Sequence, residues 1–532
     1  MIGTIYSLIP ALLTILLVVL TRRVILSLGV GVISAALILA SFHFGNTISI
    51  ILQTFSSLVL EKDGLYGFLN EWNMSIIFFL IALGIITAYI VLSGGATAFT
   101  KAIIRRVKTR EGVQYTSAIL GILIFVDDYF NALVVGNVSK PLAQQQNVSR
   151  ARLAYIVDST SAPICVISPI SSWATGIMGS MAVIFAGTGV TYSAFSAFLQ
   201  TIPYHFYVIT CVIMVFVVIR FNLNLGSMKT YEQDAINGND SSITQSEISN
   251  AHGGEVESSK GTIWDLILPI VMLIVVTVGA MAYTGIQGAI ANPNPEFNFF
   301  FNILDHIDLA PSLRWGGLAA LILSMVMAYR HVQNKEVTTA DYAKAFVSGA
   351  RSMFGAIGIL LLAWAICELV GDLDAGGYLA SLITNSNIDP NFIPVMMFIV
   401  ASLMAFATGT SWGSFGILLP IAGSVAAAID INLMIPVMSA VLSGAIFGDH
   451  ASPISDTTLL SATGSGCDLG AHFTSQLPYA LLSATIAALG YIAFGFTGSL
   501  IASYSVIILG FVGIIFHARH QNNQSNSSLS SK

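Results

Sequence analysis

The stretch FGDHASPISDTTLL, residues 447–460, places two carboxylates, an imidazole and a proline inside a long apolar run. An ionised aspartate at the centre of a bilayer costs at least about 2.5 kcal/mol. Asp449 and Asp456 have no basic residue to pair with, because the sequence contains no Lys or Arg between Arg351 and Arg519. The stretch therefore predicts either that these carboxyl groups are protonated or that a cation binds to them.

The composition around this stretch is that of a membrane protein. The chain is 55% hydrophobic and 9% charged, whereas soluble proteins carry about 25% charged residues. Apolar runs of roughly 20 residues recur, which is long enough for a spanning helix, and they lack the alternation of a β-barrel. We therefore expect an all-α polytopic membrane protein with about 11 transmembrane segments. No basic patch indicates nucleic-acid binding, and the four isolated cysteines form no disulfide or metal motif.

The basic residues predict how the chain crosses the membrane. Lys and Arg in short loops mark the cytoplasmic side. Arg22 and Arg23 follow the first apolar run, residues 101–110 are rich in Lys and Arg, and Arg519 precedes the polar tail. This pattern predicts a multi-pass protein of the inner (plasma) membrane, with the N-terminus outside and the C-terminus cytoplasmic.

Two apolar runs are expected to form re-entrant hairpins instead of simple crossings. The run 113–139 has basic residues at both ends and carries Asp127–Asn131 at its middle. Such irregular backbone is tolerated at membrane depth only where protein or water covers it. A second hairpin is expected over 392–431, with its tip at Thr408–Ser411, followed by a broken helix over 433–463.

A short repeat relates the two halves of the chain. The tetrapeptide SPIS occurs at 168–171 and again at 452–455. Asp128 precedes the first copy by 40 residues, and Ser411 precedes the second by 41. Order and spacing predict the inverted repeat of secondary transporters. We divide the chain into a first repeat (1–220), a flexible cytoplasmic linker (221–262), a second repeat (263–497), and a last helix with the tail (498–532).

Prolines free three backbone carbonyls in the predicted broken helices. A helical proline removes the hydrogen bond to the carbonyl four residues earlier, so Pro163, Pro169 and Pro453 release the carbonyls of Ser159, Cys165 and Asp449. Their new partners are bound cations, Ser or Thr hydroxyls, or water. Unwound carbonyls with side-chain oxygens are a usual sodium site in such transporters.

The polar residues of the hairpins and breaks form the candidate site. We expect cation or substrate binding by Asp127, Asp128, Asn131, Asp158, Ser159, Ser168, Ser171, Thr410, Ser411, Asp449, His450, Ser452, Ser455, Asp456 and Thr457, with Asp128, Asp449 and Asp456 as the metal-ion ligands. Burial favours the neutral form of a carboxyl group, so these aspartates would exchange protons for cations. Other roles stay open: Asp127, Asp128 and Asp158 could be helix caps, and His450 could be a packing residue.

One motif resembles an enzyme signature. Residues 409–413, GTSWG, fit G-x-S-x-G, but that motif requires a strand before it and a hydrolase sheet around it. The sequence supplies no sheet. We therefore expect a protein that is not an enzyme.

Several motifs resemble the NhaC-type sodium/proton antiporter family. They are GDHASPISDTTLLSATG and QLPYAL in the second half, and FVDDYFNALVVGN and DSTSAP in the first. More distantly, ATGTSWGSFGILLP looks like a hairpin tip of the ion-transporter superfamily. The resemblance covers roughly 70–500 and implies paired hairpins, broken helices and cation-coupled transport.

The predicted function is sodium/proton antiport by alternating access. The alternative is a sodium- or proton-coupled transporter of an amino acid or hydroxy acid, because relatives of the family differ in the solute that they carry. No cofactor is expected beyond the transported sodium ion and proton. The expected partners are these ions, the lipid bilayer and, as an open alternative, a second copy of the chain.

Overall fold

The computed structural model describes residues 2–21, 24–60, 70–95, 97–99, 107–190, 193–243, 258, 260–291, 303, 306–374, 378, 389–453 and 455–530. Arg22, Arg23, Lys101, Arg105 and Arg106, on which the predicted orientation partly depends, lie outside these ranges. The described residues are helical apart from turns and one isolated bridge between Ile243 and Cys467.

The first half contains α1 (Ile9–Thr21), α2 (Val24–Leu39), α3 (Phe44–Val59), α4 (Glu71–Leu92), α6 (Arg110–Leu123), α7 (Asp128–Gln145), α8 (Arg150–Thr160), α9 (Ala162–Ile167), α10 (Ser172–Thr188), α11 (Ala194–Thr201), α12 (Phe206–Phe221) and α13 (Met228–Ile236). The second half contains α15 (Trp264–Ala291), α17 (Leu309–Gln333), α18 (Thr339–Ser352), α19 (Phe354–Asp372), α21 (Ile393–Thr408), α22 (Ser411–Ile429), α23 (Met434–His450), α24 (Asp456–Ser465), α25 (Leu469–Thr497) and α26 (Leu500–Ser530). Short 3-10 turns cover Ile5–Leu8, Ile202–Tyr204, Pro390–Phe392 and Ile431–Leu433.

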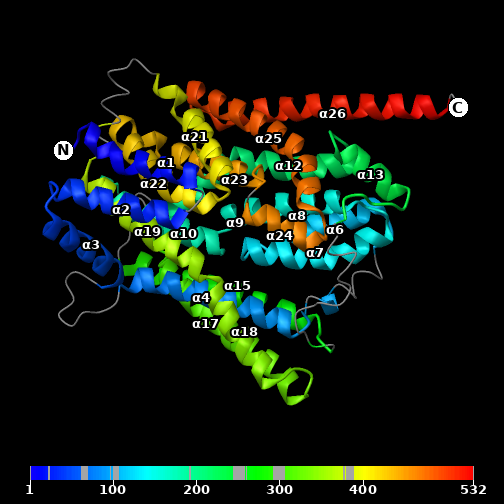
Figure 1. Ribbon diagram of the computed structural model, residues 1–532, viewed down its shortest axis with the longest axis horizontal. Coiled ribbons are helices and arrows are strands. Elements are labelled where there is room, and N and C mark those ends of the chain that lie inside the picture. Colours follow the sequence, from blue (N-terminus) through cyan, green and yellow to red (C-terminus); the bar gives the residue numbers. More distant parts are fainter. Residues whose placement is uncertain are drawn as a thin grey trace.

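The helices form an elongated bundle (Figure 1). Helix α26 lies along one long edge, helices α15, α17 and α18 lie along the opposite edge, and the hairpins and broken helices lie between them. Among the described residues, eight helical segments are long and apolar enough to cross a membrane, or nine if the pair α11 and α12, bent by 50°, counts as one span. These segments confirm an all-helical, multi-span architecture.

The first hairpin consists of α6 and α7. The chain turns at residues 124–127, and the amide of Asn131 closes the turn by donating to the carbonyls of Gly121 (2.6 Å) and Ile124 (2.7 Å). Helix α7 begins at Asp128, because a carboxylate is favourable at the positive end of a helix. The turn thus lies slightly before the predicted Asp127–Asn131, whose later residues belong to the first helical turn.

The second hairpin, α21 and α22, has its turn where the sequence predicted it. Gly409 ends α21 with a positive φ of +68°, a conformation that favours glycine. The Thr410 side chain then caps α22 by accepting a hydrogen bond from the backbone amide of Gly413.

Both copies of SPIS lie at breaks between helices, and the last serine of each copy caps the following helix. Ser171 caps α10 by accepting from the amide of Ala174. Ser455 caps α24 by accepting from the amides of Thr457 and Thr458. Each of these serines therefore caps the helix that follows a break.

Part of the segment expected to be a flexible linker packs against the bundle. Acceptors from this segment bind the first free amides of α8: Glu232 accepts from Ser149 N (2.9 Å), Asp240 from Arg150 N (2.8 Å), and Ser242 from Ala151 N (3.1 Å). Such amides have no partner within their own helix. Residues 228–242 are thus an integral cap of α8.

Candidate functional site

A cavity of about 250 Å³, called here the central cavity, lies between the two hairpin turns. Its walls come from both halves of the chain and are formed by Leu80, Asp127, Asp128, Tyr129, Ser172, Ser352, Met353, Gly355, Thr410, Trp412 and Asp456. The structure therefore brings three of the predicted carboxylates and one predicted hydroxyl to one place.

Five helices begin at the central cavity. The first residues of α7, α10 and α24 line it directly, and α19 and α22 begin beside it. Each helix N-terminus carries a partial positive charge of roughly +0.5. Backbone dipoles thus supply positive potential beside the aspartates of the cavity.

Asp127 connects the turn of the first hairpin to the start of α10. Its Oδ2 atom accepts a hydrogen bond of 3.0 Å from the Ser172 hydroxyl. The backbone amide of Ser172 donates in turn to the carbonyl of Val126 (2.9 Å). These two bonds fix the hairpin turn against the start of α10.

Asp128 is the carboxylate with unused hydrogen-bonding capacity. Its residue is 3% exposed, and its Oδ2 atom has no hydrogen-bond partner among the described residues. Buried polar atoms are almost always satisfied by protein, water or ions. Asp128 is therefore the most suitable group in the central cavity for taking up a proton or a cation.

Asp449 connects the second hairpin to the second break. Its Oδ2 atom accepts from Ser411 twice, from the hydroxyl (2.7 Å) and from the backbone amide (3.2 Å), and its Oδ1 atom accepts from the Ser455 hydroxyl. The residue is 4% exposed. No Lys or Arg of the described residues forms an ion pair with it, as the sequence predicted.

Asp456 lines the central cavity, but its side chain is exposed, unlike the other predicted aspartates. The Tyr129 hydroxyl donates to its Oδ2 atom at 3.5 Å. Tyr129 belongs to the first half and Asp456 to the second, so this contact crosses between α7 and α24. Asp456 thus lies at the mouth of the cavity and not at its deepest point.

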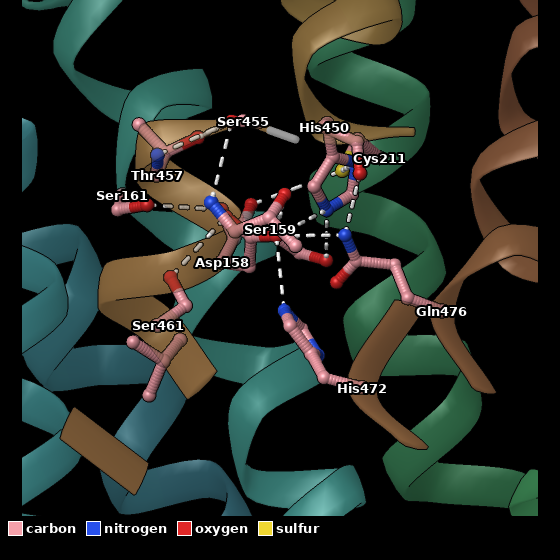
Figure 2. A network of polar contacts seen from close by, with 12 residues as sticks. Asp158, Ser159, Ser161, Cys211, His450, Ser455, Thr457, Ser461, His472 and Gln476 are labelled. Carbon is pink, nitrogen blue, oxygen red and sulfur yellow. Dashed lines mark hydrogen bonds and ion pairs between the residues drawn. The ribbon is translucent and has the colours of Figure 1, made fainter. Parts of the chain in front are cut away.

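Asp158 lies in a separate network, 1% exposed, shown in Figure 2. Its two oxygens accept from Ser461 Oγ (3.2 Å), Thr458 Oγ1 (3.4 Å), His472 Nε2 (3.2 Å) and Gln476 Nε2 (2.7 Å). These donors belong to α24 and α25. A carboxylate with four protein donors is well satisfied, so Asp158 holds α8 to the second half of the chain.

His450 belongs to the same network. Its Nδ1 atom lies 2.6 Å from the Tyr207 hydroxyl, and its Nε2 atom lies 3.1 Å from the Ser159 hydroxyl. Both ring nitrogens are occupied by protein groups, which is the arrangement of a hydrogen-bonded packing residue.

The carbonyls freed by the prolines have partners within the protein, and so do the hydroxyls of most remaining serines. Ser452 N donates to the carbonyl of Asp449 (2.9 Å), Ser171 Oγ to that of Cys165 (2.7 Å), and Cys211 Sγ lies 3.8 Å from that of Ser159. Ser168 Oγ donates to Ile164 O (2.7 Å), Ser452 Oγ to Phe406 O (2.9 Å), and Thr457 Oγ1 lies 2.8 Å from Ser455 Oγ. These residues shape the breaks.

Sequence reasoning missed several groups of both sites. Tyr129, Ser172 and Trp412 line the central cavity, and His472, Gln476 and Ser461 bind Asp158. The spacing of His472 and Gln476, four residues apart, places them on one helix face, but it does not identify Asp158 as their partner.

The described residues contain no group of three His, Cys, Asp or Glu side chains that could hold a metal ion. Sodium prefers oxygen ligands of any kind, and hydroxyl and carbonyl oxygens serve as well as carboxylates in such transporters. Asp128, Asp449 and Asp456, which the sequence predicted as metal-ion ligands, do not form such a group among the described residues.

Comparisons with known proteins agree with this architecture. Residues 164–496 match the Na+/H+ antiporter family. The chain is 39% identical over 515 residues to an uncharacterized protein of Haemophilus influenzae, which spans 97% of this chain and 95% of the relative. It is 33% identical over 195 residues to the malate-2H(+)/Na(+)-lactate antiporter of Bacillus subtilis, over 36% of this chain and 38% of that protein.

A solved structure supports the fold. The YdaH transporter of Alcanivorax borkumensis aligns with a TM-score of 0.51 at 12% identity, over 84% of this chain and 88% of that chain. At this identity the likeness concerns the fold alone. The matched family consists of antiporters, which confirms the resemblance seen in the sequence and the expectation that GTSWG is not part of an enzyme.

Proposed function

The chain belongs to the Na+/H+ antiporter family, and we propose that it exchanges sodium ions for protons at the central cavity by alternating access. One observation carries this proposal. Asp128 is buried, its Oδ2 atom has no partner among the described residues, and the carboxylate of Asp127 is next to it in sequence and in the cavity wall. Neighbouring carboxylates cannot all stay ionised in a poorly solvated site, so a proton and a sodium ion compete for the same place.

The charges around the central cavity support a site for monovalent cations. Four carboxylates, those of Asp127, Asp128, Asp449 and Asp456, lie at or beside the cavity. The five helix N-termini offset roughly two to three of these negative charges. The remainder corresponds to one or two sodium ions or protons, so neither an Arg nor a divalent ion is needed for balance.

The conformational part of the proposal rests on the matched halves of the chain. Each half contributes a hairpin and a broken helix, and the serines Ser171 and Ser455 cap corresponding helices. We infer that the halves form an inverted repeat and exchange roles as the cavity opens to either side. We further infer that the chain lies in the inner membrane, with the N-terminus outside and the C-terminus inside.

The test is sodium-driven proton movement in proteoliposomes. Asp128→Asn is expected to abolish it, because the amide keeps the size of the side chain but cannot ionise. Asp430→Asn is the matched control, because Asp430 is an exposed turn cap outside the cavity and an asparagine caps as well. Full exchange by Asp128→Asn would overturn the role given to this residue.

A second candidate function has an observation in its favour. Convergent helix N-termini bind anionic groups, and half-helix N-termini hold substrate carboxylates in related architectures. The central cavity would then take a small hydroxy acid or amino acid together with a cation, and the partial match to a malate/lactate antiporter agrees with this. A panel of such acids distinguishes the candidates: exchange that requires an acid in addition to sodium favours the second.

A further inference from the structure

A second, larger cavity of about 560 Å³ lies at the other ends of three helices that begin at the central cavity. We call it the vestibule. Its walls include Val183 and Thr188 of α10, Glu368 and Asp372 of α19, and Pro420 and Ser424 of α22. The carboxylates give the vestibule a negative potential, which raises the local concentration of cations.

Helices α10, α19 and α22 connect the two cavities. They pack against one another in all three pairs. All three begin at the central cavity, near Ser172, Gly355 and Trp412, and all three end at the vestibule. Trp412 and Pro420 are eight residues apart on α22, which corresponds to about 12 Å at 1.5 Å per residue. Only this length separates the cavities.

Aromatic side chains fill the intervening length. The rings of Trp173, Trp412 and Phe415 contact one another with centroids 5.2–5.8 Å apart. Trp364 lies farther along, where its indole packs on Gly179. We call these four residues the aromatic block. Phe415 and Trp364 are 2% and 0% exposed, so the block excludes water from the region between the cavities.

Two features of the aromatic block differ from an ordinary packed core. The indole nitrogen of Trp364 is buried without a hydrogen-bond partner among the described residues, although buried indole N–H groups usually have one. Small residues of α10 also accommodate the rings. A Cβ atom added at Gly176 would lie 2.6 Å from Trp412, and one at Gly179 would lie 3.0 Å from Trp364.

We propose that the contact region of α10, α19 and α22 is the route by which cations pass between the vestibule and the central cavity, and that the aromatic block closes it in this state. The proposal rests on the proposed function for the identity of the cargo. In the open state, water entering the route satisfies the indole N–H group of Trp364. Trp412, which is only partly buried and lines the central cavity, is the ring with room to move.

Cysteine accessibility tests the route without assuming the cargo. The variants are Ser424→Cys in the vestibule, Leu360→Cys beside the aromatic block, where Leu360 is 1% exposed and packs near Gly176, and Leu313→Cys as a buried control on α17. Each is treated with a charged, membrane-impermeant methanethiosulfonate over a range of sodium concentrations and pH. Labelling is counted above that of the unsubstituted chain, which keeps its own cysteines.

Ser424→Cys is expected to react under every condition. Leu360→Cys is expected to react at some sodium concentration or pH at least about tenfold faster than Leu313→Cys, because only the former lies on a segment that opens. A Leu360→Cys rate equal to that of Leu313→Cys at every sodium concentration and pH would overturn the route. Labelling of Leu360→Cys in a chain that shows no sodium/proton exchange would instead leave the route standing and refute the proposed function.

A pair of glycine variants gives a second measurement. Gly176→Ala is expected to slow exchange about tenfold, which corresponds to a barrier increase of about 1.4 kcal/mol, because the methyl group presses on Trp412. Gly279→Ala, on α15 and outside the walls of both cavities, meets no atom within 4 Å and is expected to exchange normally. Equal exchange by both variants would count against a gate at Trp412.

Discussion

The Nε2 atom of Gln476 on α25 donates a 2.7 Å hydrogen bond to Oδ2 of Asp158 on α8, and so joins residues 318 positions apart in the sequence. The same nitrogen lies beside the carbonyl of His450 at 2.5 Å. One amide group thus links a carboxylate of the first half to the broken helix of the second. This network and the central cavity are distinct, and the two should respond differently to mutation.

Asp158→Asn is expected to destabilise the fold, because one oxygen that accepts from His472 and Gln476 or from Ser461 would be replaced by an N–H donor. Hydrogen bonds to charged groups contribute roughly 1.5–3 kcal/mol each, so a clear drop in the melting temperature in detergent should follow. Asp468→Asn is the control, since Asp468 only caps α25 and asparagine caps equally well. A normal melting temperature together with lost exchange would instead assign Asp158 to cargo binding.

Tyr207→Phe removes the hydroxyl that contacts His450 at 2.6 Å. A loss of roughly 1 kcal/mol in unfolding free energy is expected for a buried neutral hydrogen bond. Tyr283→Phe on α15 is a suitable comparison, because Tyr283 is 67% exposed. Denaturation that ranks Tyr283→Phe as the more damaging change would contradict the contact.

Asn131→Leu is expected to loosen the first hairpin. The side-chain amide of Asn131 donates to Gly121, Ile124 and Thr160, and leucine of similar size leaves three buried carbonyls without this donor. Each unsatisfied group costs about 1–3 kcal/mol. Asn137→Leu on the same helix is exposed and should be neutral. Thermal stability in detergent measures both, and equal stability would show that Asn131 acts elsewhere.

Glu336, in the turn after α17, predicts a pH dependence of stability. Hydrogen bonds from His331 (2.6 Å) and then Ser258 (2.5 Å) hold the pKa of this carboxyl below its ordinary value. A lowered pKa in the folded protein stabilises it above the unfolded pKa of about 4.5, and this contribution is lost as the pH falls through the folded value.

The melting temperatures of the wild type and Glu336→Gln should therefore differ at pH 5 and converge as the pH falls below about 4.5. Glu111→Gln, on an exposed first turn of α6, serves for comparison. A difference that grows as the pH falls from 5 to 3 would have the wrong sign for this interaction.

The hairpins and breaks were predictable because their signals are local. Basic residues at both ends of 113–139, Gly409 at the second turn, and the two SPIS segments each constrain only nearby backbone. The burial of Asp128 and Asp449 could likewise be predicted, since a carboxylate that faces lipid in an apolar run is costly.

The role of Asp158 could not be predicted, because its donors lie about 300 residues away and their approach depends on packing of the two halves. Asp456 illustrates the same limit, since the position of a residue within an apolar run does not show which side of α24 faces the cavity mouth. The polar segment after α12 looked like a linker, because composition gives no sign that its carboxylates bind the free amides of α8.

The contact between residues 228–242 and the start of α8 limits where a module can be inserted into the chain. A fluorescent reporter or an affinity module placed between 228 and 242 would pull Glu232, Asp240 and Ser242 away from the start of α8, and with it the helix that carries Asp158. A polar composition is therefore no sign that residues 228–242 tolerate an insertion.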